Sequence, residues 1–173
     1  MTRILVAGGT GTVGRAVVDR LVSAGADVRV LSRGRRRGDH DVEYVTGDVR
    51  SGDGLDAAVA GVDTIVACVD PVARLVAAAA RAGAPHLVYI SIVGIERIPF
   101  FYYRRNLADE RVIAASDVPW TVLRATQFHD LIAAIMRLLA KPPVMAVPAG
   151  MSIQPVDVRE VGQRLAQLAL GEP

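Results

Sequence analysis

The stretch VAGGTGTVGR, residues 6–15, places four glycines within seven positions, directly after the short apolar run RILVA at residues 3–7. A short continuous apolar run is typical of a strand that is buried on both faces of a sheet. The segment at residues 12–25 follows with apolar residues spaced by four, as on one face of a helix: Val13, Val17 and Leu21. The stretch therefore predicts a glycine-rich turn between a buried strand and a helix.

The glycines of this turn fit two overlapping patterns. Gly9, Gly11 and Gly14 make G-x-G-x-x-G, and Gly8 with the last two makes G-x-x-G-x-x-G. Between a strand and a helix, the early glycines allow the turn and the approach of a pyrophosphate, and Gly14 allows close packing of the helix. The helix N-terminus adds free N–H groups and a favourable dipole. A purely structural turn is the alternative, but we expect a dinucleotide to contact Gly8, Thr10, Gly11, Thr12, Val13 and Gly14.

The rest of the chain continues the alternation of strands and helices. Strands are expected at residues 27–32, 42–48, 63–70, 85–91 and 119–125, with short extended pieces at 143–147 and 152–156. Helices are expected at residues 54–61, 71–83 with Pro71 at the first position, 104–116, 128–140 and 157–170. This order predicts an α/β fold with a doubly wound parallel sheet (Rossmann), a single domain over residues 1–173 in which about 126–173 form a short substrate-side part.

The end of the second strand bears on the choice of nucleotide. An NAD site usually has an acidic residue about 20 positions after the glycine loop, which binds the ribose hydroxyls. Here the chain reads Ser32-Arg33 and continues with arginines at 35–37, without a carboxylate nearby. A guanidinium pairs well with a 2′-phosphate, so we expect Arg33 to favour NADP(H) over NAD(H). A solvated basic loop is the alternative.

Two further strand ends supply candidate cofactor contacts. After the third strand, Asp48 could accept from the adenine amino group with Val49 against the ring, or Asp48 could instead cap a turn. In the fourth strand, Cys68 is expected to pack rather than to act as a nucleophile. Cys68 and Val69 lie toward the carboxyl edge of the sheet, where cofactors bind in folds of this kind.

Composition limits the remaining classes of function. The chain has 173 residues, is 51% hydrophobic and carries a net charge of only +2, which fits one folded domain and gives no reason to expect direct nucleic-acid binding. Its single cysteine excludes an internal disulfide framework and suits the cytoplasm. We expect no signal peptide, no membrane segment and no metal site, because no apolar run approaches about 20 residues and no ligand spacing is apparent.

Several segments together resemble a known family. GGTGTVGRAVV, the basic residue after the second strand, GDVR, HLVYIS, VPWTVLRATQF and QPVDVREV are similar to segments of the atypical short-chain dehydrogenase/reductases, most closely the NmrA-like, NAD(P)H-binding branch. The resemblance covers essentially the whole chain, in order. It implies a Rossmann protein that binds NADP(H) or NAD(H). Some members reduce quinones, flavins or small carbonyl compounds, and others bind the nucleotide as redox sensors.

The resemblance also implies a catalytic Ser, Tyr and Lys, the last two spaced Y-x-x-x-K. Ser91 ends the fifth expected strand and Tyr102 stands at the tyrosine position, but in YYRRNL the lysine position is Asn106. An amide carries no charge and cannot lower a tyrosine pKa electrostatically, although it could bind the ribose. We therefore assign Ser91, Tyr102 and Asn106 to the catalytic positions, and the asparagine argues against a standard Tyr/Lys proton relay.

Two segments near the expected carboxyl edge supply candidate substrate contacts. IPFFYY, residues 98–103, groups four aromatic side chains, and Phe101 among them could line a pocket or belong to the core or a subunit contact. After the sixth strand come Gln127, Phe128 and His129, which could touch the nicotinamide or the substrate. His129 also stands at a helix start, where an imidazole often only binds backbone.

Relatives commonly continue beyond the helix at 157–170 with a segment that helps to close the substrate site. We therefore expect an open pocket, a site closed by another subunit, or a truncated version of a longer relative. The leading function is an NADP(H)-dependent oxidoreductase acting on a small organic acceptor such as a quinone, flavin or carbonyl compound. The alternatives are a nucleotide-binding redox sensor with little turnover and a non-redox biosynthetic enzyme. A homodimer is expected only from base rates.

Overall fold

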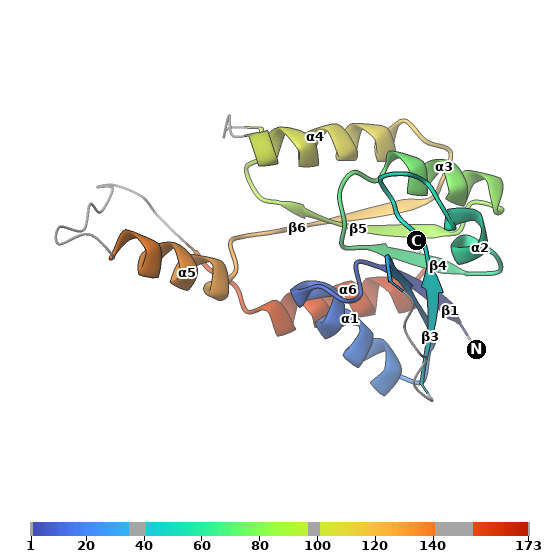
Figure 1. The fold of residues 1–173 in the computed structure, drawn as a ribbon, viewed down its shortest axis with the longest axis horizontal. Helices are drawn as coiled ribbons and strands as arrows, with labels where there is room; N and C mark the ends of the chain where they lie inside the picture. The colour runs from blue at the N-terminus through green and yellow to red at the C-terminus, as the bar shows by residue number, and fades with distance from the viewer. Residues whose placement is uncertain (1, 35–40, 97–100, 141–153, 173) are drawn as a thin grey trace.

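A computed structural model describes residues 2–34, 41–96, 101–140 and 154–172 (Figure 1). Its strands are β1 (Arg3–Ala7), β2 (Asp27–Ser32), β3 (Val42–Thr46), β4 (Thr64–Ala67), β5 (His86–Ile92) and β6 (Trp120–Ala125). Its helices are α1 (Thr12–Ser23), α2 (Leu55–Val59), α3 (Ala73–Arg81), α4 (Phe101–Ala114), α5 (His129–Leu139) and α6 (Val158–Leu170). The strands form one six-stranded parallel sheet in the order β3-β2-β1-β4-β5-β6, which confirms the doubly wound α/β fold.

The sheet separates two hydrophobic cores. Because side chains alternate along a strand, Leu5 and Ala7 of β1 face one core while Ile4 and Val6 face the other. Helices α2, α3 and α4 cover the first core, and α1 and α6 cover the second (Figure 1). Both faces of the central strands are therefore buried, which is why these strands are continuous apolar runs in the sequence.

The strand order reverses between β1 and β4. The chain moves outward from β1 through β2 to β3, and then returns to place β4 on the other side of β1. The two strands run in register from Ile4 beside Thr64 to Ala7 beside Ala67. Immediately beyond them, the Cys68 amide donates to the Ala7 carbonyl at 2.8 Å. The glycine loop after β1 therefore lies at the switch point of the sheet, the usual place for a ligand in such folds.

Some expected boundaries are wrong. Pro71 does not begin a helix: it follows a cis peptide bond with Asp70, Val72 is the N-cap residue, and α3 starts at Ala73. Strand β3 is shorter than expected, because the residues after Thr46 form a turn rather than continuing the ladder, and β4 is shorter too, with bounds at Thr64 and Ala67.

Helix α4 starts earlier than expected, at Phe101 instead of residue 104, so the aromatic residues there belong to its first turn. The extended piece at 143–147 lies outside the described residues. Of the piece at 152–156, the structure describes the part from Gln154, where Val156 forms a bridge with Phe128.

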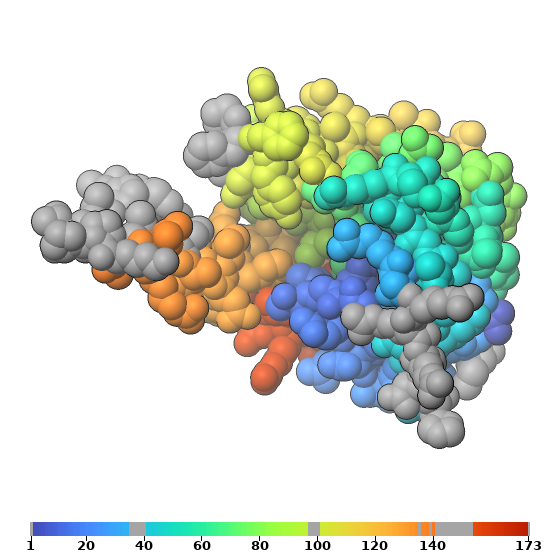
Figure 2. Space-filling view, viewed as in Figure 1, coloured from blue at the N-terminus to red at the C-terminus, as the bar shows by residue number. Residues whose placement is uncertain are grey.

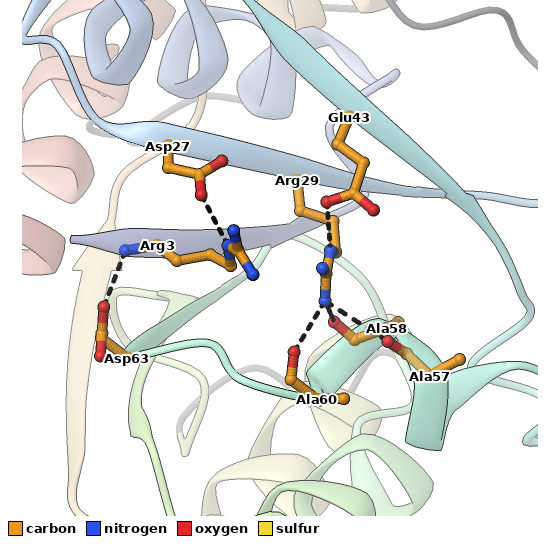
Figure 3. A network of polar contacts seen from close by, with 8 residues as sticks. All are labelled: Arg3, Asp27, Arg29, Glu43, Ala57, Ala58, Ala60 and Asp63. Atoms are coloured by element: carbon orange, nitrogen blue, oxygen red, sulfur yellow. Dashed lines mark hydrogen bonds and ion pairs between the residues drawn. The ribbon is translucent and has the colours of Figure 1, made fainter. Parts of the chain in front are cut away.

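A buried arginine fixes the position of α2 (Figure 3). Arg29 of β2 is 7% exposed, and its Nε donates at 2.8 Å to Glu43, its register partner on β3. Its Nη1 donates to the carbonyls of Ala58 at 3.0 Å and Ala60 at 2.9 Å. These carbonyls lie at the C-terminal end of α2, where helix carbonyls lack internal partners and a cation is favourable. Arg29 therefore ties two strands and one helix together.

Replacing Arg29 with alanine should destabilise the fold by about 3 kcal/mol, because the substitution leaves buried carbonyls and a carboxylate without their donor. Arg81 is the matched control. It pairs with Asp56 at 2.6 Å while both side chains are more than half exposed, so Arg81→Ala should cost less than about 1 kcal/mol. Urea unfolding of both variants measures the difference, and equal losses would show that Arg29 acts only as a surface charge.

Candidate functional site

The glycine loop is closed by contacts that exclude side chains. Gly8 has a φ of +85°, and a Cβ there would lie 2.5 Å from the Cys68 carbonyl oxygen and 2.7 Å from Cγ1 of Val69. Its own carbonyl accepts from the Gly11 amide at 2.9 Å, which closes the turn. The left-handed conformation and the lack of space both require glycine at this position.

Gly14, in the first turn of α1, lies directly over this turn. A Cβ at Gly14 would overlap the Gly8 carbonyl oxygen and lie 2.7 Å from the Gly9 Cα. Helix α1 therefore starts in backbone contact with the loop, as the spacing of glycines predicts. Its N-cap residue Gly11 offers no side-chain cap, so the first amide groups of the helix keep their capacity for an outside acceptor. The residues present fit a bound phosphate.

The strand ends beside the loop supply the next predicted contacts. Burial raises the pKa of the Cys68 thiol to about 12, so this thiol is a packing group and not a nucleophile near neutral pH. The Asp48 carboxylate accepts from the Arg50 amide at 2.8 Å, so the turn-capping alternative is present, while the adenine contact stays a prediction. Val49 is 8% exposed and packs in the core, which leaves little of its side chain for a ring.

The predicted coenzyme-discriminating residue follows β2 directly. Arg33 is exposed, and beside it the Ser32 hydroxyl donates to the Gly34 carbonyl at 3.0 Å. The arginines expected to reinforce it, residues 35–37, lie outside the described residues. The Arg33 side chain is therefore open to solvent at the carboxyl end of β2.

The three predicted catalytic positions have different surroundings. Tyr102, in the first turn of α4, is 58% exposed. Ser91 is 2% exposed near the end of β5, and its hydroxyl has no hydrogen-bond partner among the described residues. Asn106 is 4% exposed: its amide nitrogen donates to the Tyr102 carbonyl at 3.0 Å and its oxygen accepts from the Tyr89 hydroxyl at 3.1 Å. These partners direct the Asn106 amide into the interior instead of toward a ribose.

The electrostatics around Tyr102 do not favour its ionised form. Burial and the negative charge of Asp70 raise the pKa of Tyr102, and they outweigh the opposing effects of Asn106 and Arg105. Arg105 is itself paired with Asp70 at 3.4 Å. This agrees with the expectation that an asparagine cannot replace the lysine that lowers a tyrosine pKa.

The predicted substrate contacts divide into two groups. Phe101 is 76% exposed at the start of α4. The Gln127 side chain donates to the Tyr103 hydroxyl at 3.4 Å, and this bond joins the loop after β6 to the first turn of α4. Figure 2 shows the surface hollowed between the yellow-green start of α4, the orange α5 and the blue start of α1. Phe101 and Tyr102 belong to α4, and Gln127 lies between β6 and α5, so all three are on or next to helices that border this hollow.

Phe128 and His129 have other neighbours. Phe128 packs against the core beneath α1 and α6. His129 lines a cavity of about 450 Å³ that also includes Thr12 and Arg15 of α1 and the first residues of α6. This cavity reaches the glycine loop only at Thr12, so a role for His129 at the substrate stays a prediction.

Sequence reasoning missed the buried partners of Asn106. Tyr89 of β5 and Asp109 of α4 are 1% and 5% exposed, and the Tyr89 hydroxyl also reaches the Asp109 carboxylate at 3.5 Å. The buried residues of α4 are Asn106, Asp109 and Ile113, a helical spacing that was readable in the sequence. Two polar side chains on the buried face of a helix were the available signal for an internal network.

Among the described residues there is neither a cluster of side chains that could hold a metal ion nor a helix long and apolar enough to cross a membrane.

Comparisons with known proteins agree with this site. A family model described as NAD(P)H-binding matches residues 8–157. The chain is 40% identical over 135 residues to the (4-alkanoyl-5-oxo-2,5-dihydrofuran-3-yl)methyl phosphate reductase of Streptomyces griseus subsp. griseus. That match covers 72% of this chain but 48% of the reductase, so the chain spans about half the length of this curated relative.

Solved structures match the whole fold. The triphenylmethane reductase of Citrobacter sp. has a TM-score of 0.84 at 23% identity, over 99% of this chain and 66% of that one. The NADPH-dependent quinone oxidoreductase of Escherichia coli has a TM-score of 0.85 at 18% identity, over 98% of this chain and 64% of that one. The likeness to these reductases concerns the fold.

Replacing Gly14 with alanine should destabilise the protein by about 2–3 kcal/mol, because the new methyl group would push α1 away from the Gly8 carbonyl. Gly34 is the matched control: it has open space within 4 Å, so Gly34→Ala should change stability by no more than about 0.5 kcal/mol. Urea unfolding compares the two variants. A Gly14 variant as stable as the Gly34 variant would contradict the close contact.

Proposed function

The chain belongs to the NAD(P)H-binding family, and on this basis we propose that it is an NADP(H)-dependent reductase of small, conjugated organic acceptors. The observation that carries the proposal is the glycine loop: Gly8 and Gly14 close it at the switch point and leave the start of α1 uncapped. Such a cradle fits the pyrophosphate of a dinucleotide. The hollow that the start of α4 borders gives the acceptor a place near the same sheet edge (Figure 2).

NADP(H) is the proposed coenzyme because of Arg33. This exposed guanidinium follows β2, where a carboxylate would bind the ribose hydroxyls of NAD(H). Two of the similar structures support the choice: the Citrobacter reductase is described as complexed with NADP(H), and the Escherichia coli oxidoreductase with NADPH. Bound there, the reduced nicotinamide supplies a hydride, and the chain supplies position and the proton.

The proposed acceptor class follows from the weak acid at the site. Tyr102 has a raised pKa and no lysine partner, so it donates a proton poorly to an isolated alkoxide. A quinone or conjugated carbonyl compound delocalises the negative charge that hydride transfer creates, and a cationic dye is neutralised by the hydride, so both need less help from an acid. Triphenylmethane dyes, quinones and the alkanoyl dihydrofuranone of the relatives' names are all conjugated. The proposed acceptor site consists of Tyr102 and Phe101 at the start of α4, Ser91 near the end of β5, and Gln127, which contacts the first turn of α4 through Tyr103.

A second candidate is a nucleotide-binding sensor with little turnover. The observation that favours it is Asn106, which leaves Tyr102 without the cation expected of a proton relay. The single cysteine suits a reducing compartment such as the cytoplasm in either case.

One experiment separates the two functions. The purified protein is titrated with NADPH and NADH, and oxidation of the nicotinamide is then followed with a panel of quinones, triphenylmethane dyes, enones, flavins and aldehydes. Turnover with conjugated acceptors supports the reductase. Tight NADPH binding without turnover would favour the sensor, and the absence of nucleotide binding would refute both functions.

Replacing Arg33 with alanine should weaken NADPH binding about tenfold and leave NADH binding unchanged, because only the 2′-phosphate loses a charged partner. Arg164, an exposed arginine of α6, is the matched control and should alter neither affinity. Fluorescence titration measures both dissociation constants. An unchanged NADPH to NADH ratio in the Arg33 variant would remove Arg33 from the coenzyme site.

Replacing Tyr102 with phenylalanine should lower kcat for an aldehyde about 100-fold but lower kcat for a quinone less than about tenfold, because only the aldehyde product needs the phenol as an acid. Since the pKa of Tyr102 is raised, wild-type activity that depends on its protonated form should persist to pH values above about 10 before it is lost. Tyr44→Phe on β3 is the control. Equal losses with both acceptors would contradict the assignment.

A further inference from the structure

Asn106 belongs to a buried polar network that links α4, the sheet and the loop after β4. Its amide nitrogen holds the Tyr102 carbonyl at 3.0 Å, one helical turn earlier. Its oxygen accepts from the Tyr89 hydroxyl of β5 at 3.1 Å, and the same hydroxyl lies 3.5 Å from the Asp109 carboxylate. Asp109 then accepts from the Val72 amide at 3.1 Å, just before α3. The network thus runs without a break from the first turn of α4 to the loop beyond β4.

We propose that Asn106 is a positioning residue: through Tyr89 and Asp109 it holds the first turn of α4, and with it Tyr102, at a fixed height above the sheet. The proposal assigns this position a role different from the ribose contact implied by the family resemblance. It rests on the proposed function insofar as Tyr102 serves the acceptor. The positioning of α4 itself does not depend on which acceptor is reduced.

Burial restricts the side chains of the network to few arrangements. Tyr89, Asn106 and Asp109 are 1%, 4% and 5% exposed, so a change of rotamer would leave polar groups without water or protein partners. Desolvation raises the pKa of Tyr89, so its hydroxyl remains a donor at all ordinary pH values. One donor between two acceptor side chains allows few alternative arrangements, which is the condition for a rigid contact.

The far end of the network lies beside the coenzyme loop. Asp70 and Val72 follow β4 by a few residues, and the same segment begins at Cys68 and Val69, which pack against Gly8. Asp70 also pairs at 3.4 Å with Arg105 of α4, the residue directly before Asn106. Helix α4 is therefore tied twice to the segment that supports the glycine loop. This arrangement fixes the distance between the phosphate cradle and Tyr102.

Amide hydrogen exchange tests the positioning directly. The variants are Tyr89→Phe, which keeps the ring and removes only the hydroxyl, Asn106→Ala and the double variant, with Tyr44→Phe on β3 as the control. Exchange of the amides of residues 105–110 should accelerate at least tenfold in both single variants. The double variant should exchange no faster than the faster single one, because both substitutions break the same network. Acceleration no greater than in Tyr44→Phe, or additive effects, would overturn the proposal.

Kinetics test the consequence for the reaction. With the best acceptor of the panel, Tyr89→Phe should lower kcat about tenfold while the KM for the acceptor and the dissociation constant of NADPH stay within twofold. The basic limb of the kcat profile should also move to lower pH, because a loosened Tyr102 is better solvated. A uniform loss at every pH, or a kcat equal to that of Tyr44→Phe, would overturn the positioning of Tyr102. If the wild-type protein reduces no acceptor, the proposed function fails. The hydrogen-exchange experiment then still tests whether the network holds the first turn of α4.

Discussion

The start of α1 lies in direct backbone contact with the turn at Gly8, and much of the remaining structure depends on this contact. It sets the height of the helix over the sheet, and through the helix it positions α6, which packs beside it with Gly162 against Ala16. Because the N-cap residue Gly11 has no side chain, the first backbone amides of α1 are also free to bind a phosphate. Close packing and the proposed phosphate binding therefore depend on the same glycines.

The side of the sheet that α2, α3 and α4 cover is held by buried polar groups as well as by apolar packing. Arg29 ties the end of α2 to the strands β2 and β3, and the network of Tyr89, Asn106 and Asp109 ties α4 to β5. Arg29 joins β2 to a helix 29 residues further along the chain, whereas the network joins β5 to the next helix. Apolar contacts alone tolerate small shifts of a helix, whereas directed hydrogen bonds in a dry interior permit very few. Helix α4, which borders the hollow, is therefore more firmly oriented than its apolar face alone would make it.

The sequence was informative where the signal is local. Continuous apolar runs predicted the buried strands, and the spacing of Gly8 and Gly14 predicted a close approach that the backbone geometry bears out. Local patterns failed where a distant partner decides the outcome. Pro71 has the sequence signature of a helix start, yet the helix begins two residues later, and Asn106 has partners on β5 that no spacing along its own helix reveals. Contacts between elements contain the information that the local patterns lack.

The burial of Cys68 has a chemical consequence for the proposed reduction of electron-poor molecules. Quinones and conjugated carbonyl compounds are electrophiles, and they modify proteins chiefly by adding to thiolates. Cys68 is the only cysteine of the chain, and it stands at the edge where hydride transfer is proposed. With its pKa raised to about 12, the thiol remains protonated at neutral pH. Because little of the thiol is ionised, Cys68 is a poor site for addition of such electrophiles, even next to the proposed acceptor site.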